Sequence, residues 1–385
     1  LPTLNILTPI NFLYYIIIPA ILIVSLSNIN FHYDAGYYHL NNQNWLRNSN
    51  ITFGLVNFFW AFGMSSIYEY ILAFFWFDSN FLNLHLINLV FIHWLYQFLT
   101  YSLLKSKNIF LKNASLFILI FSILDNFGFQ GGRNGFIYIE GVGKQDVPVA
   151  ILFFFISLIS LLILHNKVQI DSVDMLFYSL LVLFVIQIKL NASILVLLYL
   201  LIIFQQYKLG QSIQKIYYSQ FTIIIFGLLW VLKNLITTGC FLFPLNLSCI
   251  NSFTWYSPDS TRMYEDISTQ SSMNYIIGDN FTVWVSKFLE YTFYKSLLLN
   301  FSISLLVIIF LRLLFFNKLK NNQIVFFITI FFVTSNIVYL ILFGPIPRYA
   351  TGLFMFVVAS LAIGIKEIKV KIPDIAYYVL ISASI

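Results

Sequence analysis

Apolar runs of about twenty residues recur along the whole chain, and short polar segments separate them. A helix of this length spans the hydrocarbon core of a bilayer and satisfies its own backbone hydrogen bonds there. The pattern therefore predicts an all-α, polytopic transmembrane protein with about eleven spans. These lie near residues 10–28, 82–104, 113–128, 147–165, 173–188, 191–207, 216–235, 290–313, 323–343 and 350–365, and from 374 onwards.

The same pattern predicts a single transmembrane domain over residues 1–385, interrupted by longer polar segments. Residues 29–81 and 236–289 form the two largest of these segments. Within the first, the stretch 55–77 is apolar or amphipathic, but one more full crossing would break the alternation of sides. We therefore expect re-entrant or interfacial amphipathic helices in 29–81.

Composition supports a membrane protein and excludes several other classes. Hydrophobic residues make up 60% of the chain and charged residues 9%, with a mean hydropathy of +0.86. The formal charge of +6 comes from scattered bases, which argues against a nucleic-acid partner and for contact with membrane lipid. No cleavable signal peptide is evident. The chain begins at Leu1 without Met and ends at Ile385 inside an apolar run, which is compatible with a fragment.

Lys and Arg gather in alternate connections between the predicted spans, and this sets an orientation. The basic connections are 105–112, 166–172, 208–215, 314–322 and 366–373, which we expect to be cytoplasmic. The long polar segments then face outward. We expect an integral protein of a bacterial inner (plasma) membrane whose site faces the periplasm or exterior. Nucleotides are absent there, so an enzyme would need a lipid-linked or secreted substrate.

The segment 32–39 (HYDAGYYH) holds the most informative charge, because it follows the first apolar run directly. A carboxylate at the mouth of a membrane helix is a candidate functional group, so Asp34 is a candidate catalytic residue. The alternative is a solvated loop carboxylate beside a helix end. Tyr38 and His39 are candidate substrate-binding residues next to it, although a lone His near a helix is more often structural.

Three further charges stand at predicted outer ends of spans. Asp146 opens a span in 143–150 (GKQDVPVA), either for catalysis or as an ordinary acid at a helix N-terminus. Lys189 separates two apolar runs and either binds substrate or snorkels to the interface. Arg348 lies in a short outer loop, and its planar guanidinium suits phosphate.

The polar segment 236–289 and the span before it add three candidates. Lys233 ends a predicted span and either faces a phosphate or marks the interface. Cys240 and Cys249 lie nine residues apart around Pro244, which favours a disulfide in an oxidising compartment over two unrelated thiols. No His lies between them, so a zinc site is not expected.

These features in this order resemble the GT-C superfamily of integral-membrane glycosyltransferases. The resemblance covers roughly residues 10–365. It is carried by the acid after the first span, a second acid opening a later span, a Lys after an apolar run (188–191, IKLN) and a late Arg loop (347–349, PRY). The string in 33–39, together with KN at 233–234 and TGCFLFP at 238–244, looks most like a bacterial branch of hypothetical membrane proteins.

The resemblance implies an inverting glycosyltransferase that moves a sugar from a polyprenyl-phosphate donor to a glycan, lipid or protein acceptor of the cell envelope. Asp34 and Asp146 would be the catalytic residues; a carboxylate can take the acceptor's proton. Arg348, with Lys189 or Lys233, could stabilise the departing phosphate. The chain lacks a clear paired-acid motif in its first outer segment and a large C-terminal soluble domain. No cofactor is therefore certain, and Mg or Mn held by Asp34 and Asp146 stays an open possibility.

Two other functions remain open at this stage. One is a polymerase or ligase of lipid-linked polysaccharide, which uses similar chemistry and a larger donor. The other is a transporter or flippase for a lipid-linked glycan, without covalent chemistry. Transporters tend to contain internal repeats with broken helices and binding groups at the membrane midplane. This chain shows no such repeat, and its polar groups gather on one face, which argues weakly against transport.

Overall fold

The structure is a computed structural model. It describes residues 8–26, 33–64, 66–77, 82–126, 143–211, 213–269, 281–290, 323–343, 346–363 and 374–384, with the single positions 302, 306 and 309. Within these ranges the regular structure is helical and contains no strand, so the all-α prediction is confirmed. One isolated β-bridge joins Cys240 and Cys249.

The elements follow one another along the chain in a fixed order, beginning with α1 (Pro9–Phe12), η1 (Leu13–Ile17), α2 (Ile18–Leu26), η2 (Ala35–His39), α3 (Leu40–Asn48), η3 (Leu55–Asn57), η4 (Trp60–Gly63), α4 (Ile67–Phe75), α5 (Leu82–Leu104), α6 (Ile109–Asn126) and α7 (Asp146–Asn166). The second half contains α8 (Ser172–Ile188), η5 (Leu190–Leu195), α9 (Val196–Lys208), α10 (Ile213–Thr238), η6 (Asn246–Ser248), α11 (Pro258–Thr269), α13 (Phe281–Glu290), α15 (Gln323–Phe343), η8 (Pro347–Ala350), α16 (Thr351–Ser360) and α17 (Asp374–Ser384).

Several helices are long and apolar enough to cross a membrane. Five segments meet this condition, namely Leu86–Leu104, Asp146–Asn166, Leu190–Lys208, Gln220–Thr238 and Phe326–Phe343. Shorter apolar helices cover Pro9–Val24, Ile109–Ile123, Ser172–Ile188, Arg348–Ser360 and Ile375–Ser384. The described helices therefore coincide with most of the predicted spans. The predicted span 290–313 lies almost entirely outside the described residues.

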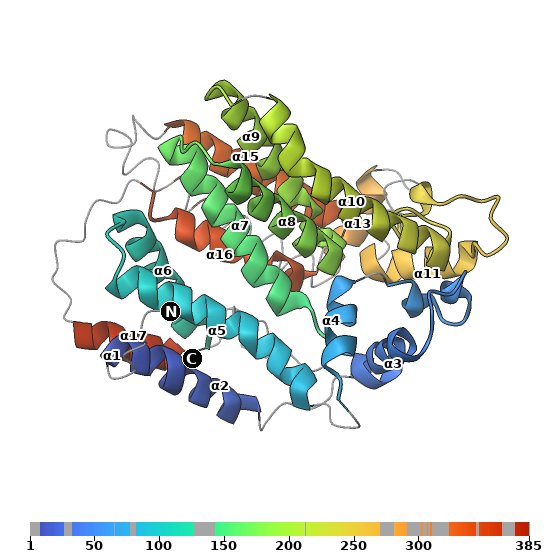
Figure 1. The fold of residues 1–385 in the computed structure, drawn as a ribbon, viewed down its shortest axis with the longest axis horizontal. Helices are drawn as coiled ribbons and strands as arrows, with labels where there is room; N and C mark the ends of the chain where they lie inside the picture. Colours follow the sequence, from blue (N-terminus) through green and yellow to red (C-terminus); the bar gives the residue numbers. More distant parts are fainter. Residues whose placement is uncertain are drawn as a thin grey trace.

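Helix α7 forms the centre of the bundle, where it packs against α5, α8 and α16 (Figure 1). Its sequence is apolar on all sides, which is typical of a helix with neighbours all round. Most of its residues between Val147 and Leu161 are buried. Gly352 lets α16 approach closely, because a Cβ there would lie 2.8 Å from the Ala150 carbonyl oxygen. Small residues serve the same purpose where membrane helices cross.

The polar segment 29–81 folds into short helices at one end of the bundle, next to α11 (Figure 1). Helix α4 begins where the Ser66 side chain accepts a hydrogen bond from the Tyr68 amide. It packs against α3, α5 and α8. These contacts bring residues from 33–77 to the end of the bundle where α7 begins.

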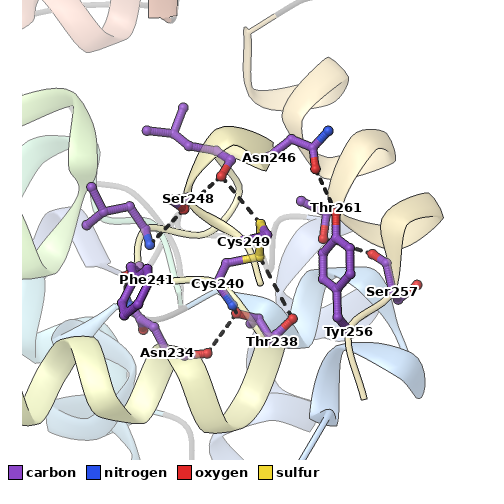
Figure 2. The surroundings of a disulfide bond; sticks show 12 residues. Asn234, Thr238, Cys240, Phe241, Asn246, Ser248, Cys249, Tyr256, Ser257 and Thr261 are labelled. Atoms are coloured by element: carbon purple, nitrogen blue, oxygen red, sulfur yellow. Dashed lines mark hydrogen bonds between the residues drawn. A yellow bond between two sulfur atoms is a disulfide. The ribbon is translucent and has the colours of Figure 1, made fainter. Parts of the chain in front are cut away.

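The disulfide predicted between Cys240 and Cys249 is present, with an S–S distance of 2.07 Å (Figure 2). It closes a loop directly after α10, and Cys240 is completely buried. Asn234 holds the start of the loop because its Nδ2 donates to the Phe241 carbonyl oxygen at 3.1 Å. Tyr256 holds the other end by donating from its hydroxyl to Asn246 Oδ1 at 2.6 Å.

Candidate functional site

A cavity of about 300 Å³ opens where α7 begins and α8 ends. Its walls come from segments that are far apart in the sequence. Most of the candidate residues predicted from the sequence line it, together with aromatic side chains. The charged and polar lining includes Asp34, Tyr38, His39, Lys144, Gln145, Asp146, Lys189 and Arg348, and the aromatic lining includes Trp230, Phe243, Tyr264, Tyr339, Phe343 and Tyr349.

Asp146 is the first residue of α7 and is held by two cations. Lys189 Nζ binds its Oδ1, and Arg348 Nε lies 3.1 Å from its Oδ2. The carboxylate is buried, whereas the Arg348 side chain is 44% exposed. Both carboxylate oxygens are therefore engaged. Asp146 is better placed to fix the two cations than to accept a proton from a ligand.

Tyr349 completes this cationic group. Its ring centroid lies 3.8 Å from Lys189 Nζ and 5.5 Å from Arg348 Cζ, within the range of cation–π attraction. Burial lowers the pKa of Lys189, but the Asp146 carboxylate raises it more, so the net shift is upward. Lys189 thus keeps its positive charge, and the group offers two fixed cations to an anion in the cavity.

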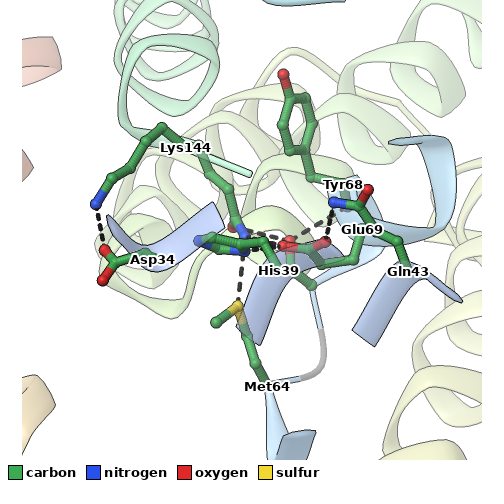
Figure 3. A network of polar contacts seen from close by, with 9 residues as sticks. Asp34, His39, Gln43, Met64, Tyr68, Glu69 and Lys144 are labelled. Atoms are coloured by element: carbon green, nitrogen blue, oxygen red, sulfur yellow. Dashed lines mark hydrogen bonds and ion pairs between the residues drawn. The ribbon is translucent and has the colours of Figure 1, made fainter. Parts of the chain in front are cut away.

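Asp34 forms a second ion pair on another wall of the cavity. It directly precedes η2, and its Oδ2 accepts a hydrogen bond from Lys144 Nζ at 2.5 Å (Figure 3). The Asp34 side chain is 23% exposed and that of Lys144 10%. Tyr38 follows one turn later. Burial, then Tyr264 and Asp34, raise the pKa of the Tyr38 hydroxyl, so this group stays neutral and can donate a hydrogen bond.

A buried hydrogen-bond network lies behind this wall (Figure 3). His39 Nδ1 lies 2.5 Å from Glu69 Oε1, and Gln43 Nε2 donates to Glu69 Oε2 at 2.6 Å. Gln145, which precedes Asp146, donates from Nε2 to Glu69 Oε1 at 3.4 Å and accepts from Ser66 Oγ at 2.8 Å. Glu69 therefore connects the Asp34 wall of the cavity to the start of α7.

Sequence reasoning missed Lys144, Gln145 and Glu69. Glu69 is the only acid in the apolar stretch 55–77, and that isolation was a usable signal. Lys144 and Gln145 are adjacent to Asp146, but nothing in their spacing from Asp34 indicated that they would meet it. Their roles depend on contacts between distant segments.

Lys233 does not line this cavity. It faces a smaller cavity of about 60 Å³, whose lining includes Trp45 and Tyr70. Its Nζ lies 5.5 Å from the Tyr70 ring centroid. The structure therefore separates Lys233 from Lys189 and Arg348, with which the sequence had grouped it as a phosphate-binding candidate.

The donor set of the cavity does not fit the divalent metal that Asp34 and Asp146 were considered to hold. Each carboxylate is already paired with a Lys or Arg, and a metal would have to displace these cations or lie beside them. Within the part of the chain that the structure describes, no three His, Cys, Asp or Glu side chains form a metal-binding group. We assign no metal step to these residues.

Fold and site together define a class: an all-α protein with apolar helices long enough to cross a membrane and a charged, aromatic-lined cavity at one end of its central helix. The chain belongs to the family described as "Domain of unknown function (DUF8201)", which matches residues 3–355. Comparison with curated proteins and with solved structures gives no significant match.

Proposed function

We propose that this protein is a GT-C-type membrane glycosyltransferase that moves a sugar from a polyprenyl-phosphate donor to an acceptor hydroxyl. The observation that carries the proposal is that Asp34, Asp146, Lys189 and Arg348 line one cavity. The proposal includes about eleven spans in a bacterial inner membrane, with the cavity facing the periplasm or exterior. The acceptor is a cell-envelope glycan, lipid or protein.

The cations around Asp146 suit the phosphate of the donor. Arg348 carries a planar, always-charged guanidinium that matches a phosphate, and Lys189 adds a point charge. Because Asp146 and Tyr349 hold both cations in advance, they need not reorganise when negative charge develops. These groups therefore stabilise the phosphate as it leaves the sugar.

Asp34 suits the acceptor side of the reaction. The acceptor hydroxyl oxygen attacks the anomeric carbon, and a new C–O bond forms on the face opposite the leaving group. The bond from that carbon to the phosphate oxygen breaks, and its electron pair leaves with the polyprenyl phosphate. The Asp34 carboxylate takes the hydroxyl proton, while Lys144 holds the carboxylate in place.

The apolar part of the lining suits a lipid-linked substrate. Trp230, Phe343 and Ile186 line the same cavity as the charged groups. Their helices α10, α15 and α8 contain or form apolar membrane-length segments. A polyprenyl chain can therefore lie among apolar side chains while its phosphate reaches Arg348.

The proposal is tested by incubating membranes with a radiolabelled polyprenyl-phosphate sugar and following the label into acceptor. Wild type should transfer the label. Asp34→Asn keeps the shape and removes the base, which is typically worth about 10²–10⁴-fold in rate. This variant should lose nearly all transfer and stay inserted in the membrane. Asp34→Asn/Lys144→Gln removes the ion pair as a whole and should be equally inactive.

Asp259→Asn is the matched control, because Asp259 is an exposed acid on α11 outside the cavity lining. It should transfer at the wild-type rate. Full transfer by Asp34→Asn would remove Asp34 from the mechanism. If wild type moves the labelled lipid across the membrane and forms no glycosidic bond, the protein is a transporter and the proposal is wrong.

A further inference from the structure

His39 and Glu69 form a buried pair whose histidine also reaches the cavity. His39 is 3% exposed and Glu69 1%. Nδ1 of the ring meets Glu69 Oε1 at 2.5 Å, and Gln43 occupies the other carboxylate oxygen. His39 belongs to the cavity lining, whereas Glu69 does not. Burying a carboxylate is costly, so the contact it makes here needs a reason beyond packing.

The imidazole is held in one orientation. Gly143 has a φ of +85° and lies against the ring, where a Cβ would come within 2.1 Å of His39 Cγ. The Tyr38 ring centroid lies 4.1 Å from that of His39. In Figure 3 the second ring nitrogen, Nε2, points away from Glu69, on the side where Asp34 and Lys144 lie. Among the described residues Nε2 has no hydrogen-bond partner.

The carboxylate decides which nitrogen carries the proton. A carboxylate offers only acceptor oxygens, so Nδ1 donates to Glu69 as an N–H group. Nε2 then presents its lone pair to the cavity. A carboxylate behind a histidine fixes both the tautomer and the direction of the ring in the same way at other sites. The cavity wall thus contains one preset hydrogen-bond acceptor.

We propose that this acceptor is a binding subsite for a hydroxyl group, and that Glu69 is a positioning residue that acts through His39. A lone pair requires a donor from the ligand. The ammonium and guanidinium groups of Lys144, Lys189 and Arg348 make the cavity unfavourable for a cationic donor, so a neutral hydroxyl fits best. The inference rests on the proposed function only in naming the ligand as the hydroxyl-bearing acceptor of the transfer.

The first test does not depend on transferase activity. Purified protein with ¹⁵N-labelled histidine is observed by NMR, and His39→Gln assigns the His39 signals. Wild type should show a protonated Nδ1 and an unprotonated Nε2. Methyl α-glucopyranoside, an uncharged polyol, should shift the Nε2 signal. Glu69→Met removes the carboxylate and should lower the Nδ1-protonated population and abolish the response to the glycoside.

The second test uses the transfer assay with varied acceptor. Glu69→Met should raise the acceptor KM about tenfold, the equivalent of one lost hydrogen bond, and leave kcat within about threefold. Glu69→Gln, which keeps the shape of the side chain, should lie between it and wild type. The double variant His39→Gln/Glu69→Gln should be no worse than His39→Gln alone, because Glu69 acts through the histidine. Glu265→Gln on α11 lies outside the cavity lining and should behave as wild type.

The outcomes separate this inference from the proposed function. An Nε2 signal that ignores the glycoside in wild type, or a tautomer unchanged in Glu69→Met, overturns the subsite. So does a Glu69→Gln effect of full size in the His39→Gln background. A normal NMR response without sugar transfer by wild type leaves the hydroxyl subsite standing and overturns the transferase.

Discussion

At the scale of single residues, the pairing of charges decides what each carboxylate can do. Lys144, Lys189 and Arg348 share the cavity with Asp34 and Asp146, so three positive charges face two negative ones. The remaining single positive charge matches one phosphodiester anion. Asp146 binds two of the cations and Asp34 binds one. This asymmetry assigns Asp146 to holding the cations and Asp34 to the acceptor.

Arg348 provides the clearest prediction at this scale. Arg348→Lys keeps the charge but loses the fork of donors and the contact of Arg348 Nε with Asp146. Losing one hydrogen bond to a charged group costs about 1.5–3 kcal/mol, so kcat/KM for the donor should fall about 10–100-fold. Steady-state transfer kinetics measure this. Arg262→Lys, a charge-conserving change on α11, serves as the control. An unchanged kcat/KM in Arg348→Lys would show that this arginine does not contact the phosphate.

At the scale of elements, the loop after α10 is a wall of the cavity that the disulfide closes. Phe243 and Leu245 lie inside the loop and line the cavity. The Phe243 ring stacks on Tyr264 of α11 with a centroid distance of 5.3 Å. The disulfide therefore joins two functions: it shortens the flexible chain between α10 and α11, and it fixes aromatic side chains at the site.

Removing the disulfide should weaken both. A cross-link around a loop of this length stabilises a protein by about 2–3 kcal/mol through the entropy of the unfolded chain. Cys240→Ser/Cys249→Ser should therefore lower the thermal midpoint by several degrees and reduce transfer. Differential scanning fluorimetry in detergent measures the first effect and the transfer assay the second. Mass spectrometry of unreduced wild-type peptides should show Cys240 and Cys249 linked; two free thiols there would rule out the bond.

At the scale of the whole molecule, helix α7 relates the site to the membrane. Its 21 residues span about 30 Å, close to the thickness of the hydrocarbon core. Asp146 begins this helix, and Lys167 follows its other end. The cavity therefore lies near one membrane surface, and the basic connection 166–172 lies near the other. The proposed orientation places the cavity on the outer side.

Accessibility labelling tests this orientation. Leu247 is 95% exposed in the disulfide loop, so Leu247→Cys should react with a membrane-impermeant maleimide in intact cells. Lys167→Cys should react only after permeabilisation, because its loop is predicted to be cytoplasmic. Wild type, with both native cysteines bonded, gives the background. Labelling of both positions from the same side would overturn the topology.

The sequence by itself determined the helical architecture, because a run of apolar residues is a local property that a bilayer or a helix bundle reads directly. It also indicated Asp34, Asp146, Lys189 and Arg348, since charges in an otherwise apolar chain stand out wherever they fold. The same isolation made Cys240 and Cys249 recognisable as a pair. No tertiary information was needed for these assignments.

Only the tertiary structure decided how the charges pair. Lys144 meets Asp34 across 110 positions of the chain, and no local pattern specifies that contact. Lys233 looked equivalent to Lys189 in the sequence, but the packing of α10 directs it to another cavity. Glu69 acquires its role only by being buried against His39, 30 positions away. Long-range packing sets these distances, and a carboxylate becomes a base, a clamp for cations or a support for a histidine according to the partner that packing gives it.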